Sequence, residues 1–478
     1  MLPTSDLTIK KKPPKPLSPN TTKALLQSLQ SYYTSARTRS CLVLSVLLFQ
    51  FFLLLSVLSS SLRRQPTLPI SSSSCSSGTV YVYDLPPMFN SDLINDCDSL
   101  NPWNSRCDAL SNSGFGRRLR PSWYATDQFA AELIFHRRIL HHRCRTSDPS
   151  SASAFYIPFY AGLAVGKYLW SSNHTSRDRD FHCEKLLRWV SHQEPYRRSD
   201  GWDHFIMLGR ITWDFRRSRS GNSDWGSSFL YMPGMSNVTR LLIERNPWDP
   251  LDVGVPYPTG IGIRSLDRLH WQAHILSKRR STLFAFAGAT RSTIKNDFRG
   301  VLLQQCEAAE GRCRAVDCGG RRCTKSGAAA AVELFLDSEF CLQPRGDSFT
   351  RRSMFDCMIA GAVPVFFWRR TAYTQYEWFL PGEGESWSVF IDRREVKNGT
   401  GSVREVLEGL GEERVRKMRE RVVELLPRLV YAEPEMGLGG VGDAFDVAVE
   451  GVLKRFRRRR LQRQEEEGKE EEEAAEEG

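Results

Sequence analysis

An uncharged run near the N-terminus limits what this chain can fold into. Residues 40–62 contain no Asp, Glu, Lys or Arg, and most of them are Leu, Val or Phe. A helix of about 20 such residues crosses the ~30 Å hydrocarbon layer of a bilayer. A buried core helix is disfavoured because Ser- and Pro-rich sequence follows, with nothing to pack against. We therefore expect a single transmembrane helix over residues 40–62.

The charges beside this run predict its orientation. Lys and Arg are concentrated in residues 1–39, which places the N-terminus in the cytosol by the positive-inside rule. A cleaved signal peptide is the alternative, but both the leader and the apolar run exceed the usual lengths. We expect a cytosolic tail over residues 1–39, an uncleaved signal anchor, and a lumenal Ser/Pro-rich stem over residues 63–78. The protein would then be a single-pass type II membrane protein.

Cysteines and glycosylation motifs agree with a lumenal location. Eleven of the twelve cysteines follow the apolar run. Four of them lie close together with six, four and four residues between them: Cys306, Cys313, Cys318 and Cys323. Zinc ribbons prefer pairs with two intervening residues, so short disulfide loops are favoured, with no pairing indicated. N-glycosylation triplets begin at Asn173, Asn237 and Asn398.

Length and composition indicate a large folded region. The chain has 478 residues, of which 41% are hydrophobic and 25% charged, so we expect about two packed domains rather than a disordered protein. The net charge of +11 would permit nucleic-acid binding. Many of the basic residues lie in the leader or beside the acidic C-terminal tail, and the expected lumenal location makes a nucleic-acid partner improbable.

Two series of strands and helices follow the stem. In the first, strands are expected at 79–83, 154–159, 203–208 and 229–232, with helices within 123–144 and 181–192. In the second, strands are expected at 282–286, 339–343 and 362–367, with a helix at 350–360. This α/β pattern predicts two Rossmann-like domains facing a cleft, over residues 79–275 and 276–455. Residues 456–478 are expected to be a disordered basic and acidic tail.

The loop between the strand at 339–343 and the helix after it is the strongest candidate binding site. Ligands of open parallel sheets lie at the carboxyl ends of strands, and a helix N-terminus attracts anions. Glycine there permits close approach, hydroxyls donate, and arginines suit a diphosphate. A capped helix start with solvated arginines is the alternative. The expected donor-binding residues are Arg345, Gly346, Ser348, Thr350, Arg351 and, for ribose hydroxyls, Asp356.

The order of residues here is more specific than their composition. Residues 340–367, Phe-Cys-Leu-Gln-Pro-Arg-Gly-Asp-Ser-Phe-Thr-Arg-Arg-Ser-Met-Phe-Asp-Cys-Met-Ile-Ala-Gly-Ala-Val-Pro-Val-Phe-Phe, resemble the donor-sugar region of exostosin-type glycosyltransferases. Further matches, to the plant branch that includes xyloglucan galactosyltransferases, lie at 82–86, 123–129, 155–162, 201–205, 209–217 and 443–446. Arg345, Cys357 and Ala362 depart from that branch, where Pro, Ser and Cys are expected.

The resemblance covers about residues 79–455 and implies a function. It implies a type II Golgi protein of the GT-B type, with an acceptor half followed by a nucleotide-sugar half. The implied reaction is inverting transfer of galactose from UDP-galactose to xyloglucan, with other glycosyltransferases as candidate partners. Three alternatives are open. The protein could use another UDP-sugar and another polysaccharide, or it could be a catalytically silent structural partner of other transferases. It could also be a basic module that binds carbohydrate or nucleic acid.

No metal or other cofactor is expected. Enzymes of the implied fold commonly work without a metal-binding Asp-x-Asp motif. Asp96-Cys-Asp98 and Asp178-Arg-Asp180 have that spacing, but neither follows an apolar strand. The arginines and the helix N-terminus would stabilise the leaving diphosphate instead.

Inverting transfer requires a base for the acceptor hydroxyl. We expect His204 as base or acceptor contact with Asp203 orienting it, at a strand start that would face the cleft. Asp214 and Glu132 are alternatives. A structural histidine bonded to backbone groups would account for the same pattern.

Overall fold

The computed structural model describes Gln50 and residues 75–476, except 171–172, 219–220, 222–223, 263–264, 290–296, 317–320, 434–437 and 439. Ser74–Gly478 form one compact unit. The expected cytosolic tail and all of the expected transmembrane helix but Gln50 lie outside the described residues. Among the helices that are described, none has both the length and the apolar character needed to cross a membrane.

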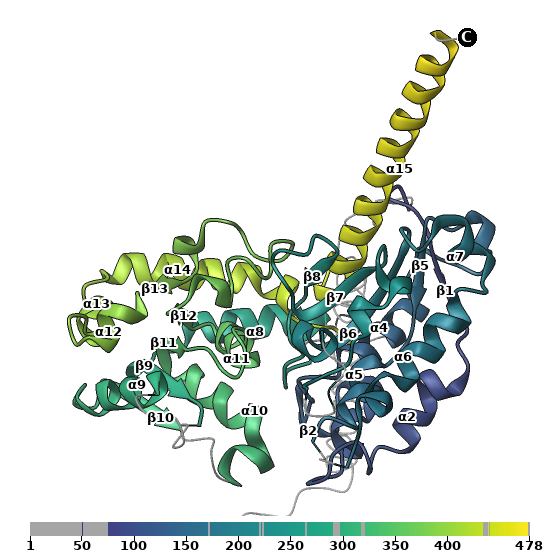
Figure 1. The fold of residues 1–478 in the computed structure, drawn as a ribbon. Helices are drawn as coiled ribbons and strands as arrows, with labels where there is room; N and C mark the ends of the chain where they lie inside the picture. Colours follow the sequence, from purple (N-terminus) through teal and green to yellow (C-terminus); the bar gives the residue numbers. More distant parts are fainter. Residues whose placement is uncertain are drawn as a thin grey trace, which may run out of the picture. The chain divides into compact units, whose positions relative to one another are not determined.

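The first half of the compact unit, residues 75–262, is built on a six-stranded parallel sheet (Figure 1). Its strand order is β4-β1-β5-β6-β7-β8, and every neighbouring pair is parallel. The strands are β1 (Val80–Val82), β4 (Arg145–Thr146), β5 (Ala154–Ile157), β6 (His204–Ile211), β7 (Thr239–Glu244) and β8 (Asp252–Gly254). A separate antiparallel pair joins β2 (Arg118–Arg120) to β3 (Trp123–Tyr124).

Alternating side chains cover both faces of this sheet. Phe205 and Met207 of β6 pack on one face with α4 (Ala131–Leu140), whereas Ile206 and Leu208 pack on the other with α5 (Ala161–Gly166) and α6 (Ser176–Val190). This alternation is the period of two that a strand imposes, and it accounts for the almost continuously apolar strand sequence. The helices of this half are α2 (Ser91–Asn95), α3 (Cys107–Leu110), α4 (Ala131–Leu140), α5 (Ala161–Gly166), α6 (Ser176–Val190) and α7 (Glu194–Ser199).

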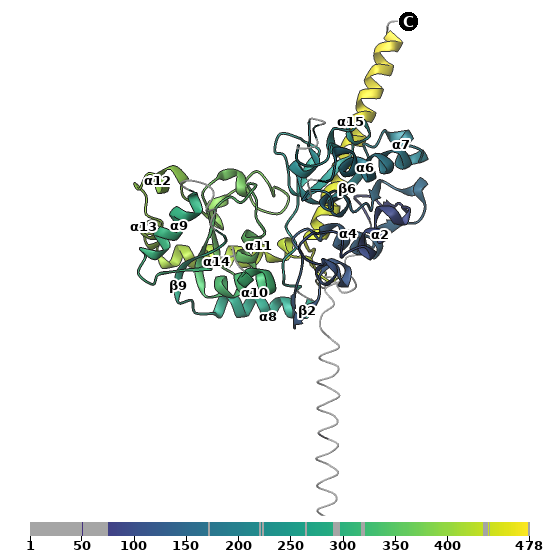
Figure 2. The same cartoon turned by 60° about the horizontal axis from the view of Figure 1, so that its bottom comes forward.

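The second half, residues 265–433, contains a five-stranded parallel sheet in the order β10-β9-β11-β12-β13. The strands are β9 (Thr282–Ala287), β10 (Cys313–Val316), β11 (Ser338–Gln343), β12 (Val363–Phe366) and β13 (Val389–Phe390). The helices are α8 (Ser265–Ser277), α9 (Phe298–Glu307), α10 (Arg321–Leu336), α11 (Arg352–Ile359), α12 (Arg393–Lys397), α13 (Val403–Glu408) and α14 (Glu412–Leu425). Helices α8 and α14 lie side by side (Figure 2).

The predicted α/β class with parallel sheets is confirmed. Two details of the prediction are wrong. Residues 229–232 are not a strand, because Phe229–Tyr231 form a 3-10 helix and the next strand is β7. The region of Cys313 contains strand β10, which the glycine- and arginine-rich sequence around it concealed.

The C-terminal tail was predicted to be disordered, but the structure describes it as helical. Residues Ala444–Glu476 form one helix, α15, whose distal part extends away from the sheets (Figure 1). Glu, Arg, Lys and Ala are strong helix formers, and oppositely charged residues four apart, such as Glu450 and Lys454 at 3.3 Å, support a helix. The first turns of α15 return to the first half, where Val452 and Phe456 join the same apolar cluster as Phe205.

A buried ion pair fixes the start of α15. Arg138 of α4 donates to Asp443 at 3.0 Å and to Asp446 at 3.3 Å, and Asp443 also accepts the backbone N–H of Ala432. Asp443 is fully buried, and burial raises its pKa although the charge of Arg138 opposes this. Residues 443–446, which resembled the family pattern, therefore join the end of the chain to the first half.

The disulfide interpretation of the cysteines is confirmed in part. Cys306 pairs with Cys313, whereas Cys318 and the side chain of Cys323 lie outside the described residues. Other disulfides join Cys75 to Cys144, Cys97 to Cys107 and Cys341 to Cys357. Cys357, which departs from the expected serine, is thus bonded to the neighbouring strand β11.

Candidate functional site

A cavity of about 710 Å³ lies where the carboxyl ends of the two sheets meet. Ile211 at the end of β6 and Ala287 at the end of β9 both line it. The first half supplies the wall around residues 124–129, and the second half supplies residues 287–289 and 346–356. Open α/β sheets bind ligands at this position because the loops there are free to vary.

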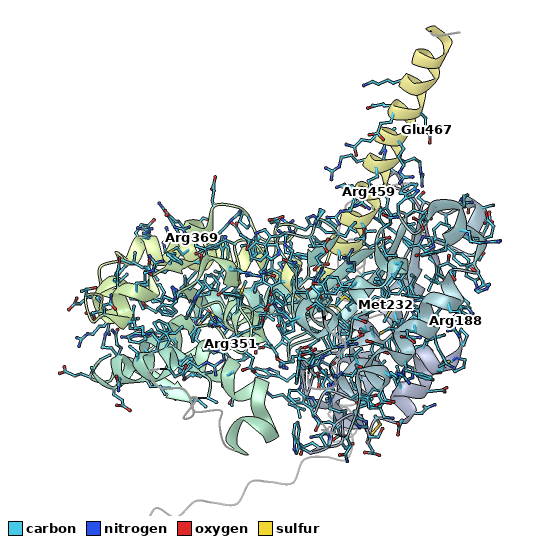
Figure 3. The ribbon with its side chains drawn as sticks, viewed as in Figure 1. Arg188, Met232, Arg351, Arg369, Arg459 and Glu467 are labelled. Carbon is cyan, nitrogen blue, oxygen red and sulfur yellow. A yellow bond between two sulfur atoms is a disulfide. The ribbon has the colours of Figure 1, made fainter. Side chains whose placement is uncertain are left out.

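The donor loop, residues 344–351 between β11 and α11, forms much of the second wall. Of the residues expected to bind the donor, Gly346, Ser348, Thr350, Arg351 and, on the helix after the loop, Asp356 all line the cavity. Arg351 is labelled in Figure 3. Most of the residues expected to bind the donor are therefore brought together.

Arg345 is the exception. Its side chain is exposed and does not line the cavity, and its guanidinium lies 5.0 Å from the ring of Phe349. The Arg345 carbonyl accepts from Arg299 at 3.3 Å. The expectation that Arg345 contacts the diphosphate is thus not supported by its position.

Arg299 lines the cavity and was missed by the sequence reasoning. It lies in the first turn of α9, and its Nη1 donates to the carbonyl of Ala289 at 2.7 Å. Arg351 donates from Nη2 to the carbonyl of Ala287 at 3.1 Å. A Cβ added to Gly288 would lie 3.0 Å from that Nη2, so a larger residue would crowd the arginine. Two arginines therefore converge where a ligand can approach the backbone of residues 287–289.

A carboxylate from the first half holds the donor loop. Glu244 is the last residue of β7 and is only 1% exposed. It accepts from the Ser348 hydroxyl, from the Thr350 backbone N–H at 2.8 Å and from the Thr350 hydroxyl at 2.6 Å. We expected these hydroxyls to face the nucleotide sugar. They instead donate hydrogen bonds to Glu244, because a buried carboxylate requires hydrogen-bond donors. Glu244 had no signal in the sequence, because its partners lie more than 100 residues away.

Asp356 and Arg352 present polar atoms to the same cavity. Arg352 lies 3.4 Å from Asp356 and donates to the carbonyl of Thr126 at 2.7 Å. Burial raises the pKa of Asp356, although the charge of Arg352 opposes this. Arg352 Nη2 and Asp356 Oδ1 are buried without a hydrogen-bond partner in the described part of the chain. Buried polar atoms are normally satisfied, so these two are candidates for ligand contacts.

His204 and Asp203 are not where they were expected. His204 begins β6, at the end of the strand opposite to the cavity, and is fully buried. It bonds to Asp203 at 2.7 Å and to the Tyr83 hydroxyl at 2.8 Å, and it stacks on Phe155. Burial lowers the pKa of His204. The prediction that this pair faces the cleft is wrong, and its contacts are those of a structural histidine.

The two alternative carboxylates are also buried. Asp214 pairs with Arg210 at 2.6 Å and accepts from the indole of Trp225 at 2.7 Å. Glu132 of α4 accepts from the backbone N–H groups of Gly162 and Gly209, at 2.6 and 2.8 Å. Burial raises the pKa of Glu132 to about 8. Both lie behind the first wall of the cavity rather than on it.

Of the two acidic pairs with metal-ligand spacing, Asp178 and Asp180 have structural roles. Asp178 forms a capping box with Thr175 at the start of α6. Asp180 binds Arg217 and accepts from Ser227 and from the Ser228 backbone. A group of ligand-type residues near Asp98 contains Cys97 and Cys107, which are joined as a disulfide.

The expected glycosylation sites differ in exposure. Asn173 and Asn398 are exposed. The side-chain nitrogen of Asn237 donates to both the carbonyl and the carboxylate of Asp200, at 3.1 and 2.8 Å. Asn237 would have to leave these contacts to carry a glycan.

Comparison with known proteins identifies the family. The model of the exostosin GT47 domain matches residues 74–407, which include both walls of the cavity. The chain belongs to the exostosin GT47 family. The expectation of an exostosin-type glycosyltransferase is therefore confirmed, and the cavity is the candidate active site.

Three relatives from Arabidopsis thaliana show where the chain lies within the GT47 family. Xyloglucan galactosyltransferase XLT2 is 60% identical over 395 residues, or 80% of this chain and 76% of the relative. Xyloglucan galactosyltransferase MUR3 is 38% identical over 84% of this chain and 65% of its own length. Xyloglucan-specific galacturonosyltransferase 1 is 40% identical over 80% of this chain and 58% of its own length. The alignments thus span somewhat less than two thirds of the last two relatives.

A solved structure also aligns with this chain. The GtfA/B complex gives a TM-score of 0.30 at 10% identity, over 58% of this chain and 61% of that one. The assignment of the α/β fold rests on the two parallel sheets themselves.

Proposed function

We propose that this GT47 protein transfers galactose from UDP-galactose, with inversion, to side chains of xyloglucan. The observation that carries the proposal is the 60% identity to a xyloglucan galactosyltransferase over 80% of this chain. The shared length includes the cavity and both of its walls. The arrangement of two parallel sheets around one cavity supports the GT-B type.

The second half would bind the nucleotide sugar. Arg299 and Arg351 would contact the diphosphate, because guanidinium groups form paired bonds with phosphate oxygens. The backbone N–H groups at the start of α11 add positive potential at the same wall. Asp356, with its unpartnered buried Oδ1, would accept from a ribose hydroxyl. Arg351 would then stabilise the negative charge that develops on the departing UDP.

We propose that this reaction needs no metal ion. A bridging cation would require carboxylates close to the phosphate oxygens. The wall that would hold the diphosphate presents Arg299, Arg351 and Arg352 beside Asp347 and Asp356, and we expect the arginines to neutralise the phosphate charge. Asp178 and Asp180, which have metal-ligand spacing, are engaged in a helix cap and in an ion pair.

The acceptor would enter from the first half. Its attacking hydroxyl must lose a proton to a base within hydrogen-bond reach. The His204–Asp203 pair is sealed in the core and cannot serve, so the base belongs to a group that reaches the cavity.

We also propose a location in the Golgi membrane, with the catalytic part in the lumen. The support is the uncharged run over residues 40–62, the basic leader, and the disulfides of the described region, which are typical of oxidising compartments. A protease added outside sealed Golgi vesicles should remove only the leader. Digestion around Cys306 would contradict this orientation.

The full-length protein, solubilised in a mild detergent, should be incubated with UDP-sugars and xyloglucan oligosaccharides. We expect galactose transfer from UDP-galactose. Transfer from UDP-galacturonic acid alone would favour the second candidate function, which the 40% identity to a galacturonosyltransferase supports. No transfer from any UDP-sugar would favour a silent structural partner of other transferases.

A further inference from the structure

Three exposed tryptophans form a row on the first half. Trp103, Trp170 and Trp225 come from separate segments, yet the ring centroids of Trp103 and Trp170 are 5.4 Å apart and those of Trp170 and Trp225 are 5.0 Å apart. The three residues are 64%, 44% and 46% exposed. Contiguous apolar surface of this kind is uncommon on soluble domains and often marks a binding site.

One end of this tryptophan row is tied to the cavity wall through Trp103. Ser105, two residues further on, lines the cavity. Arg106 forms an ion pair at 2.5 Å with Asp127, which also lines it. The position of Trp103 is therefore set by a segment that contributes to the active-site wall.

The other end is tied to the same wall through Trp225. The Trp225 indole N–H donates to Asp214, which pairs with Arg210. The Arg210 guanidinium lies 4.3 Å from the centre of the Phe129 ring, and Phe129 lines the cavity. Asp214 does not line the cavity, but its hydrogen bond orients the Trp225 indole.

We propose that the tryptophan row binds the backbone of the polysaccharide acceptor outside the cavity, as a subsite for sugar rings remote from the reacting unit. The proposal rests on the proposed function. An indole offers an apolar face that fits the C–H face of a pyranose ring, and a polymer backbone offers such rings in succession.

The position of the row favours this occupant. A cavity of about 710 Å³ that also receives a nucleotide sugar cannot enclose a polysaccharide, so the rest of the acceptor must pass over the rim. The row begins at Trp103, two residues before Ser105 of the cavity lining, and all three indoles belong to the first half, from which the acceptor is proposed to enter. The rings are inclined to each other by 59° and 70°, so each indole packs partly on its neighbour and keeps part of its surface exposed.

Two competing roles for the row are outcomes of the test. Asn173 begins a glycosylation triplet three residues after Trp170, so the protein's own glycan could cover the row. The indoles could also serve only to pack against each other. Both alternatives predict that removing the indoles changes the stability of the protein but leaves the KM for the polymer unchanged.

The test measures transfer to two acceptors, xyloglucan polymer and a short oligosaccharide. It compares the full-length wild type with Trp103→Ala, Trp170→Ala and the double variant. The KM for xyloglucan polymer should rise about tenfold in the double variant, because each lost stacking contact removes part of the binding free energy. The KM for a short oligosaccharide that occupies only the cavity, and kcat on either acceptor, should stay unchanged. The matched controls Trp103→Phe and Trp170→Phe should keep most of the polymer affinity.

The outcomes separate this inference from the proposed function. An unchanged polymer KM in the alanine variants overturns the subsite, whatever their stability. If Asn173→Gln and the alanine variants lower the melting temperature equally and leave that KM unchanged, the row serves the glycan. If the wild-type protein transfers no sugar to either acceptor, the proposed function fails, and binding of xyloglucan polymer to wild type and variants in the absence of donor still tests the row. Equal binding there overturns the subsite.

Discussion

Glu244 offers a sharp test of how the two halves cooperate. Its carboxylate belongs to the first half, but it accepts three hydrogen bonds from the donor loop. In Glu244→Ala, the Thr350 N–H, which belongs to a residue only 5% exposed, would lose its acceptor. Leaving a buried donor unsatisfied costs about 1 to 3 kcal/mol, and bonds to a charged group contribute about 1.5 to 3 kcal/mol each. The Ser348 hydroxyl can turn to water and the Thr350 hydroxyl still has the Tyr257 hydroxyl at 3.0 Å, so the buried N–H dominates the loss. We therefore expect the loop to be displaced at a total cost of about 3 kcal/mol, the upper end of the range for one unsatisfied donor.

Calorimetric titration with UDP would measure this cost. A loss of about 3 kcal/mol in binding corresponds to a dissociation constant raised roughly a hundredfold or more. Glu244→Gln is the matched control, because its amide oxygen can still accept from Thr350 while its NH₂ donates to the Ser348 hydroxyl. This variant should lose much less affinity. If Glu244→Ala binds UDP as tightly as the wild type while remaining folded, the carboxylate does not position the donor loop.

Three further predictions concern charge. Arg351→Ala should weaken UDP binding about ten- to a hundredfold through loss of a charge-assisted contact, whereas Arg345→Ala, outside the cavity, should bind normally; equal losses would contradict the assigned positions. Transfer activity should persist in excess EDTA, and Asp178→Asn should behave like the wild type; loss of activity that manganese restores would show that a metal is required. Burial raises the pKa of Glu132 to about 8 in the folded protein, so between the unfolded value near 4.5 and pH 8 only the unfolded chain releases this proton, and the free energy of unfolding falls as the pH rises. Chemical denaturation at pH 5.5 and 7.5 should show that the wild type loses on the order of 2 to 3 kcal/mol of unfolding free energy between the two pH values and that Glu132→Gln does not; identical pH profiles would contradict the raised pKa.

The sequence predicted the features that depend on local order. The apolar strands of both sheets could be recognised because a strand buried on both faces is continuously hydrophobic, as in residues 204–208. The donor loop could be located because glycine, hydroxyls and arginines follow a strand directly. Its position at the cavity is the one that a parallel sheet imposes.

The features that the sequence did not predict depend on contacts between distant segments. Glu244 reads as the polar end of a strand until the fold brings Thr350 to it. His204 looked available because a polar pair at a strand start can face either a ligand or the core, and only the contact with Tyr83 decides between them. Arg299 lies after residues with no distinctive pattern, and only the position of α9 brings it to the cavity.

The return of α15 to the first sheet determines when this protein can finish folding. The strands of that sheet are made first, but one of their faces is completed by Val452 and Phe456, near the end of the chain. Arg138 likewise stays without its buried carboxylate partner until Asp443 has been synthesised. A ribosome-bound chain that lacks these last residues therefore exposes apolar surface on its first half. A chain truncated before residue 443 would thus offer chaperones an apolar face that α15 otherwise covers.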